Sequence, residues 1–338
     1  GQNGHGKTNI LEAIHFPKFG RSFRTTRDAD LIRFEEPFCR FELEHECDNG
    51  ARETLAVSLE RSGAKHIKID GKEVERLSNL VGRYPCVLFG PQDLTVVSGF
   101  PAERRKFLDM IGSMTDRAYL EELKGYRRVV MQRNAALRSG DFDSAFGVWT
   151  EDLLVRGCAV VERRARLVEA LGRHMQPYVQ DLSIEYSIEM AYQSELLDKR
   201  TEQVTCEQHF AARLAAAEAE ESRRRTTLVG PHRDDLDIKA DGRDLRRYGS
   251  QGQRRLVAIL LRLTELSYLD AELKERCVLL LDDVFSELDP AVSEALRRLL
   301  DGDHQIFITS PHDIEWHGEV RAFRVWQGTV ESESLQGP

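Results

Sequence analysis

The sequence predicts an α/β fold in which one lobe is interrupted by a helical subdomain. Apolar residues first alternate at period two over residues 39–69, and they then recur at the three- and four-residue spacing of helices after Pro101. Strands and helices alternate again in the last third of the chain. Because this alternation resumes only after the helices, we expect residues 1–100 and 226–338 to build one α/β lobe with a mixed sheet, and residues 101–225 to form the helical subdomain.

The first part of the lobe is expected to contain antiparallel strands. Alternating apolar residues predict three strands between residues 39 and 69, and the last of them enters an Asp70-Gly71 turn that is typical of a hairpin. The continuous apolar run at 86–89 predicts a buried strand of a central sheet.

The middle of the chain is expected to be mainly helical. Helical periodicity over 116–176, broken by a polar turn at 139–141, predicts an antiparallel helical hairpin, most simply a packed subdomain without chemistry of its own. Strict alternation over 182–190 predicts a strand, and an Ala- and Glu-rich helix is expected over 205–225. In the last third we expect strands over 236–238, 278–281, 306–308 and 323–325, with helices over 256–266 and after Pro290.

The composition is that of a soluble globular protein. Of 338 residues 41% are hydrophobic, enough for a sizeable core, and no apolar stretch approaches the roughly 18 residues of a membrane span. The net charge of −9 argues against blanket coating of nucleic acid but leaves room for local basic surfaces. Dispersed cysteines without a CxxC pair indicate a reducing, cytoplasmic compartment and no structural zinc. These are Cys39, Cys47, Cys86, Cys158, Cys206 and Cys277.

The chain begins inside a phosphate-binding loop. Residues 1–8 read GQNGHGKT and fit GxxxxGK[ST], with a helical pattern directly after them. In such a loop backbone N–H groups surround the phosphates, Lys7 reaches the outer phosphates and the Thr8 hydroxyl can ligate Mg²⁺. Since no residue precedes Gly1, the strand that should lead into the loop is expected to be missing. The predicted ATP-binding residues are Gly1, Asn3, Gly4, Gly6, Lys7, Thr8 and Asn9.

A second motif brings two acids to the end of a strand. Residues 278–283 read VLLLDD, so a buried strand delivers carboxylates at its carboxyl end, where α/β sheets bind ligands. Asp282 would hold Mg²⁺ through water, and Asp283 would orient or deprotonate the attacking water. The alternative is a strand that simply enters an acidic turn, and a P-loop in the same chain disfavours it.

A third motif opens a helix with small and polar residues. Residues 248–255 read YGSQGQRR and lead into the helix at Leu256. They expose N–H groups and the Ser250 hydroxyl to an anion. In isolation Ser250 is more simply interpreted as a helix N-cap.

The three motifs in this order resemble the ATP-binding-cassette ATPases. The resemblance implies a head-to-head dimer with two ATP molecules at the interface and a signature that acts in trans, formed by Ser250, Gln251, Gly252 and Gln253. It also implies a loop glutamine, Gln92, that contacts the metal and water, and a D-loop with Ser286 and Asp289. His312 stands near the position of a histidine switch, and two interpretations remain open: a contact to the γ-phosphate or an ordinary loop histidine.

Four further segments resemble the RecF family of bacterial recombination mediators. They are residues 20–24 (GRSFR), 89–94 (FGPQDL), 101–109 (PAERRKFLD) and 230–236 (GPHRDDL). This resemblance implies an ATP-dependent homodimer that binds gapped DNA and single-/double-strand junctions, with slow, DNA-stimulated hydrolysis. It also implies cooperation with RecR and RecO in loading RecA, and a nucleoid-associated, cytoplasmic protein without a membrane.

DNA binding is argued from clusters of arginines. Guanidinium groups on one face would bind phosphates without sequence preference, although each cluster is also typical of a solvated helix face. The candidates are Arg21, Arg24, Arg104, Arg105, Arg127 and Arg128.

Three alternatives to a DNA-repair ATPase are considered. The long hairpin and the arginine clusters disfavour a transporter ATPase subunit. The helical insertion is too short for the coiled-coil arms of other SMC-like chromosome ATPases. The paired acids Asp282 and Asp283 favour turnover over a DNA clamp in which hydrolysis is incidental.

Overall fold

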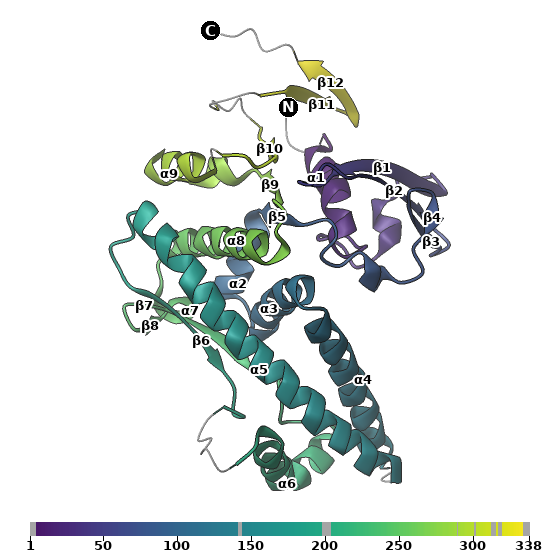
Figure 1. Cartoon of the computed structure of the whole chain (residues 1–338), viewed down its shortest axis with the longest axis vertical. Helices are drawn as coiled ribbons and strands as arrows, with labels where there is room; N and C mark the ends of the chain where they lie inside the picture. Colours follow the sequence, from purple (N-terminus) through teal and green to yellow (C-terminus); the bar gives the residue numbers. More distant parts are fainter. Residues whose placement is uncertain are drawn as a thin grey trace. The chain divides into compact units, whose positions relative to one another are not determined.

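The chain divides into two compact units, drawn in Figure 1. The first unit comprises Gly1–Pro91 and Glu265–Pro338, and the second comprises Gln92–Thr264. Both ends of the chain thus share one unit, as expected. Residues 226–264, expected in the α/β lobe, instead lie with the helices because their strand β7 pairs with β6. The computed structural model describes residues 5–140, 144–197, 204–288, 290–300, 302–311, 316 and 320–333.

A parallel sheet forms the centre of the first unit. Its strand order is β10-β9-β5, with β10 at Ile306–Thr309, β9 at Val278–Asp282 and β5 at Cys86–Phe89. Each strand is a short apolar run, typical of a sheet buried on both faces. Helix α1 (Lys7–His15) packs on this sheet through Leu11, which shares a buried cluster with Cys86 and Leu280.

An antiparallel sheet of order β1-β2-β3-β4 follows α1 in the chain. Its inward side chains form a second core of this unit, with Val57 and Leu59 fully buried. The predicted Asp70-Gly71 hairpin turn joins β3 to β4. The bounds are β1 Phe38–Glu46, β2 Arg52–Glu60, β3 Lys65–Ile69 and β4 Lys72–Glu73.

The last elements of the first unit come from the end of the chain. Helix α9 (Pro290–Leu300) begins at a proline, as expected, and follows the β9 strand. A separate hairpin pairs β11 (Ala322–Trp326) with β12 (Thr329–Glu333).

The second unit is built around helices α4 (Arg117–Ser139) and α5 (Ser144–Asp181). Contacts between them run in opposite chain order: Arg163 pairs with Asp116, and Arg133 lies over the Phe146 ring. The two helices are therefore antiparallel, as the periodicity predicts. Around them lie α2 (Leu94–Ser98), α3 (Pro101–Thr115) and α6 (Cys206–Arg224).

A small antiparallel sheet completes the second unit. The strand predicted over 182–190 begins later, because α5 continues to Asp181 and is followed by Ser183 in the left-handed conformation, with a φ of 50°. The sheet order is β6-β7-β8, followed by two helices. The bounds are β6 Ile188–Gln193, β7 Asp235–Ala240, β8 Arg243–Asp244, α7 Leu245–Tyr248 and α8 Gln251–Leu273, whose last residues belong to the first unit.

Two cysteines that the sequence treated as dispersed are paired. Cys158 of α5 and Cys206 at the start of α6 form a disulfide with their Cα atoms 5.8 Å apart. Both side chains are buried. Among the described helices, none is long and apolar enough to cross a membrane.

Candidate functional site

The start of α1 carries the predicted phosphate-binding residues that the structure describes. Gly6 is the N-cap of α1 and has a φ of 104°, a left-handed conformation that glycine adopts without strain. Lys7 and Thr8 therefore form the first turn of the helix, where backbone N–H groups have no partner within the helix. Gly1, Asn3 and Gly4 lie outside the described residues.

The predicted acid Asp282 lies directly against this helix. The Thr8 hydroxyl donates to Asp282 Oδ1 at 2.9 Å, although the two residues are 274 positions apart. The Thr309 hydroxyl donates to the same oxygen at 2.7 Å. Because β9 and β10 are parallel, their carboxyl ends meet at the first turn of α1. The structure thus brings the two sequence motifs into one polar cluster.

Asp283 has an unusual backbone and an unsatisfied carboxylate. Its φ is 54°, and its N–H donates to the Thr309 carbonyl at 3.2 Å. Its Oδ1 is buried and has no hydrogen-bond partner within the described part of the chain. Such an orphaned atom costs about 1–3 kcal/mol, and strained residues cluster at functional sites. The position suits an acceptor for a water molecule or a substrate group.

The oxygen atoms at this point suit a hard cation. Mg²⁺ prefers carboxylate and hydroxyl oxygens and keeps several waters, so it needs few protein ligands. Thr8 Oγ1 and Asp282 Oδ1 provide two such atoms 2.9 Å apart. In the described ranges no group of three or more His, Cys, Asp or Glu residues could hold a metal. The residues present therefore fit Mg²⁺ shared with a phosphate better than a metal held by protein alone.

A cavity of about 410 Å³ lies beside α1. Asn9 and Glu12 of α1 line it, together with Arg24 and Phe41. Arg24 Nη1 donates to Asn9 Oδ1 at 3.0 Å and to Glu12 Oε2 at 3.4 Å, so the loop that follows α1 is tied back to it. The cavity is lined by polar and apolar side chains in equal number, so it could contact both the polar and the apolar parts of a ligand.

The predicted signature turn belongs to the second unit and forms a capping box. The Ser250 Oγ accepts the Gln253 N–H at 3.1 Å, and Gln253 Oε1 accepts the Ser250 N–H at 2.9 Å. This box uses a lone pair of the hydroxyl and leaves its proton available to donate. Ser250, Gln251 and Gly252 are exposed. The N-cap and anion-binding interpretations are therefore compatible.

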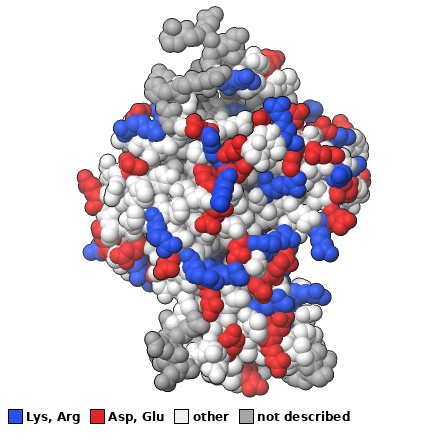
Figure 2. Space-filling model, in the orientation of Figure 1, with Lys and Arg blue, Asp and Glu red and all other residues white. Residues whose placement is uncertain are grey.

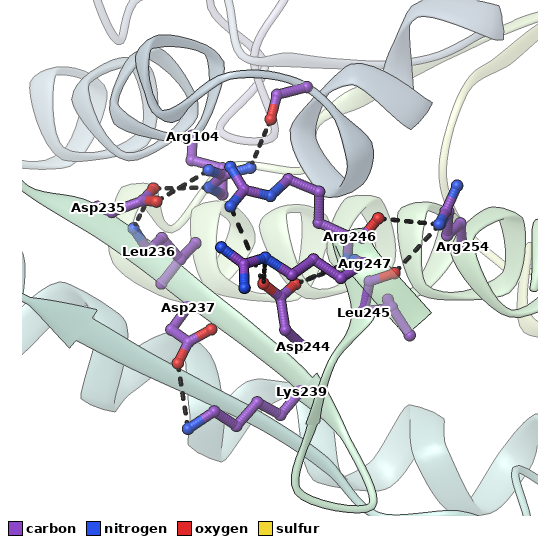
Figure 3. A network of polar contacts seen from close by, with 11 residues as sticks. Arg104, Asp235, Leu236, Asp237, Lys239, Asp244, Leu245, Arg246, Arg247 and Arg254 are labelled. Carbon is purple, nitrogen blue, oxygen red and sulfur yellow. Dashed lines mark hydrogen bonds and ion pairs between the residues drawn. The ribbon is translucent and has the colours of Figure 1, made fainter. Parts of the chain in front are cut away.

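Figure 3 shows the polar contacts of α7, the short helix that precedes this turn in the chain. Arg254 donates to the Leu245 carbonyl at 3.1 Å and to the Arg246 carbonyl at 2.8 Å, which fixes α7 against the start of α8. A Cβ on Gly249 would lie 2.6 Å from the Leu245 carbonyl oxygen, so only glycine fits between the two helices. Asp244 caps α7 by accepting the Arg246 N–H at 2.8 Å. The exposed turn thus rests on a rigid base.

The remaining predicted site residues are placed less informatively. Gln92 begins the second unit, is exposed, and accepts a bond from the Thr95 hydroxyl at its carbonyl. Ser286 is exposed and donates to the Asp283 carbonyl at 2.9 Å. Asp289 and His312 fall outside the part of the chain that the structure describes.

The arginine candidates for DNA binding separate by burial. Arg104 is 4% exposed and pairs with Asp235, and Arg105 is part-buried and donates to the Asp234 carbonyl at 2.7 Å. Arg104 is therefore used inside the fold, and Arg105 is tied to the Asp234 carbonyl through Nη1. Burial also lowers the pKa of Arg105.

Four candidates keep exposed side chains. Arg24 and Arg127 are exposed but paired, with Glu12 and Asp109 respectively. Arg21 and Arg128 are exposed as well. Figure 2 shows basic and acidic side chains intermingled over the face drawn, which agrees with the net charge of −9.

Sequence reasoning missed two residues at the site. Thr309 donates to Asp282 and accepts the Asp283 N–H. Its position at the end of the apolar run 306–308 is the sequence feature that could have indicated this role. Trp326 stacks on His5 of the phosphate-binding loop, with ring centroids 4.3 Å apart and an interplanar angle of 17°. No local sequence pattern indicates that contact.

Comparisons of sequence agree on one group of proteins. The family model described as RecF/RecN/SMC N terminal domain matches residues 1–328. A DNA replication and repair protein RecF from Symbiobacterium thermophilum is 40% identical over 345 residues, covering 98% of this chain and 90% of that protein. The same protein from Chlorobium phaeobacteroides is 35% identical over 318 residues, covering 92% and 87%.

Comparisons of structure agree with them. A solved structure of the recombination mediator protein RecF-ATP in the RecFOR pathway has a TM-score of 0.89 at 30% identity, covering 98% of this chain and 90% of that one. An Smc head bound to the C-winged helix domain of ScpA has a TM-score of 0.54 at 16% identity, covering 99% and 88%. The second likeness shows the fold alone.

Proposed function

The chain belongs to the RecF family, and from that premise we propose that it is an ATP-dependent DNA-binding protein of recombinational repair and replication maintenance. In this proposal ATP binding closes a head-to-head dimer on DNA, and slow hydrolysis releases it. The observation that carries the proposal is the contact of Thr8 with Asp282, which joins a phosphate-binding helix to a strand ending in two acids.

ATP binding is assigned to the start of α1. Lys7 would pair with the outer phosphates, and the N–H groups that follow Gly6 would surround them. The solved RecF-ATP structure, at 30% identity over 98% of this chain, supports this assignment. The cavity of about 410 Å³ beside α1 would hold the nucleoside. Thr8 and Asp282 would hold Mg²⁺, which neutralises charge on the phosphates when bound.

Hydrolysis is assigned to Asp283. Its buried Oδ1, which has no hydrogen-bond partner among the described residues, would accept a bond from the attacking water, and the adjacent Asp282 is held by two hydroxyls. Asp283 would orient this water and take its proton as general base. Its backbone is fixed by Thr309, so the carboxylate is preorganised. Gln92 and His312 remain candidates for contacts to water and the γ-phosphate.

Dimerisation is assigned to the exposed turn at Ser250. The capping box leaves the Ser250 proton free, so the hydroxyl would donate to the γ-phosphate held by a second copy. Gln251, Gly252 and Gln253 would complete this contact in trans, with the D-loop residues Ser286 and Asp289 nearby. The P-loop of one chain is then half of a composite site.

DNA binding is assigned to exposed arginines. Arg21, Arg127 and Arg128 would contact phosphates without sequence preference, with a preference for gapped DNA and single-/double-strand junctions. Arg24 would first have to leave Asn9 and Glu12, and Arg127 would first have to leave Asp109. By family membership the proposal extends to RecR and RecO as partners, to loading of RecA, and to a nucleoid-associated protein in the cytoplasm.

Sedimentation velocity of the full-length protein tests the proposal. With ATP and Mg²⁺ the wild type should shift from monomer to dimer. Lys7→Ala should remain monomeric because it lacks the phosphate contact. Ser250→Ala should bind ATP within about twofold of the wild type and yet fail to dimerise, since the hydrogen bond to the charged γ-phosphate is lost only across the interface. An ATP-dependent dimer of Lys7→Ala, or loss of ATP affinity in Ser250→Ala, would contradict the scheme.

A further inference from the structure

The turn of the β11–β12 hairpin lies on the phosphate-binding loop. The Trp326 ring stacks on the His5 imidazole at 4.3 Å between centroids. The Gln327 N–H donates to His5 Nδ1 at 3.2 Å, and the Gly328 N–H donates to the His5 carbonyl at 3.2 Å. Three consecutive residues of the turn thus hold one residue of the loop, 322 positions away along the chain.

The conformation of the turn explains why its groups point to His5. Trp326 pairs with Thr329, so Gln327 and Gly328 are the two central residues of the hairpin. Their φ angles are 47° and 79°, the left-handed pair of a tight hairpin turn. Two-residue turns of this type are rigid, because their twist matches that of the strands they join. The turn therefore holds the Trp326 ring and the N–H donors of Gln327 and Gly328 in position to contact His5.

His5 directly precedes Gly6 and the first turn of α1, whose N–H groups are expected to bind phosphate. Gly6 follows it with a φ of 104°, and α1 begins at Lys7. A Cβ built on Gly6 would lie 3.9 Å from the Gly328 Cα and 4.0 Å from Val325 Cγ1, so the hairpin approaches the loop closely here as well. A rotation of the peptide at His5 would change the direction of the N–H groups that follow, on which phosphate binding depends.

We propose that Trp326 is a positioning residue for nucleotide binding. Its stack on His5, with the two hydrogen bonds from the turn, holds His5 and the Gly6 backbone in the orientation that directs the first N–H groups of α1 towards phosphates. This role rests on the proposed ATP site at α1. Since Trp326 does not touch the phosphates itself, it acts through His5 and lowers the conformational freedom that ATP binding would otherwise have to remove.

The role predicts a specific pattern among variants. Trp326 is 52% exposed, so its replacement leaves no large internal cavity. Trp326→Ala should weaken ATP binding about three- to tenfold, the loss expected for an aromatic pair. Trp326→Phe keeps a ring on His5 and should stay within about twofold of the wild type. His5→Ala should weaken binding like Trp326→Ala, and the double variant should be no weaker than either single one.

Phe323→Ala is the matched control. Phe323 lies on the same strand, three residues before Trp326, and is 57% exposed. It should bind ATP as the wild type does. If the hairpin has only a structural role, Phe323→Ala and Trp326→Ala should weaken ATP binding equally and should lower the thermal stability by similar amounts.

Isothermal titration of the full-length variants with ATP and Mg²⁺, together with ATPase rates, makes the test. A raised Kd and KM in Trp326→Ala, an unchanged kcat at saturating ATP, and rescue by Trp326→Phe are expected. An unchanged Kd in Trp326→Ala, additive effects with His5→Ala, or a fall in kcat alone would overturn the proposal. Lys7→Ala in the same assay distinguishes failure of the proposed ATP site from failure of the positioning role of Trp326. ATP binding that survives Lys7→Ala refutes the ATP site itself.

Discussion

Replacing Arg164 by leucine should destabilise the second unit severely. Arg164 is 2% exposed and bonds Asp109 twice, through Nη2 at 2.8 Å and Nε at 3.0 Å. It also donates to the Pro231 carbonyl at 2.7 Å and to the Tyr119 hydroxyl at 3.1 Å. Burial acts to lower the pKa of Arg164, but Tyr119 and Asp109 together hold it well above the usual value. The guanidinium therefore ties α3, α4 and α5 to the 230–236 segment.

The magnitude follows from what Arg164→Leu leaves behind. Asp109 is 6% exposed, and among the described residues it would keep as partners the Tyr119 hydroxyl and Arg127, whose own side chain is 63% exposed. Breaking a buried ion pair by removing one partner costs about 3–5 kcal/mol, because the other charge stays buried. Replacing both Arg164 and Asp109 by leucine should recover much of this loss, since no orphaned charge remains.

Arg163→Leu provides a control one position away on α5. Arg163 pairs with Asp116, but the two side chains are 29% and 38% exposed. Such a surface pair contributes about 0–1 kcal/mol. Urea unfolding followed by the fluorescence of Trp149, which packs on the core of the second unit, measures both variants. A loss in Arg164→Leu no larger than that in Arg163→Leu would refute the reasoning.

The remaining predictions concern protonation, catalysis and the disulfide. Burial lowers the pKa of His232 from 6.5 to about 4, so the neutral ring stabilises the fold fully above pH 6.5, and about 2–3 kcal/mol should be lost as the pH falls towards 4. His232→Gln should flatten urea-unfolding profiles over that range, and an unchanged pH slope would argue against this origin. Asp283→Asn should retain ATP binding by titration while its hydrolysis falls at least about a hundredfold; a smaller fall would remove Asp283 as general base. Reduction of the Cys158–Cys206 disulfide, with a sequence separation of 48, should cost up to about 4 kcal/mol, and Cys158→Ser should match it without reductant. Equal unfolding midpoints of oxidised and reduced protein would contradict this.

The proximity of the phosphate-binding motif and the acidic strand could be predicted from the sequence, because these two motifs have one geometric arrangement in a parallel α/β sheet. A P-loop helix and an acid-tipped strand of a parallel sheet converge at the strands' carboxyl ends, and Thr8 and Asp282 are indeed 2.9 Å apart. The turn at Asp70-Gly71 was equally predictable, since both of its residues adopt the left-handed conformation of a tight hairpin turn.

Other features could not be predicted, because they depend on burial or on distant pairing. In the sequence Arg104 cannot be distinguished from a charged residue on a helix surface. Only the structure shows that it pairs with Asp235. The Cys158–Cys206 pair and the stack of Trp326 on His5 join residues with no shared local pattern. Whether a charged residue supports the fold or contacts a ligand depends on its surroundings in space rather than on its type.

Salt-dependent DNA binding, measured with and without ATP, tests most directly whether ATP closes a dimer on DNA. If Arg21, Arg127 and Arg128 contact phosphates in each protomer, the slope of log K against log salt should steepen from about −3 without ATP to about −5 with it, at about −0.9 per phosphate. Lys7→Ala should keep the shallow slope in both conditions. An equal slope and affinity with and without ATP in the wild type would contradict the proposed function.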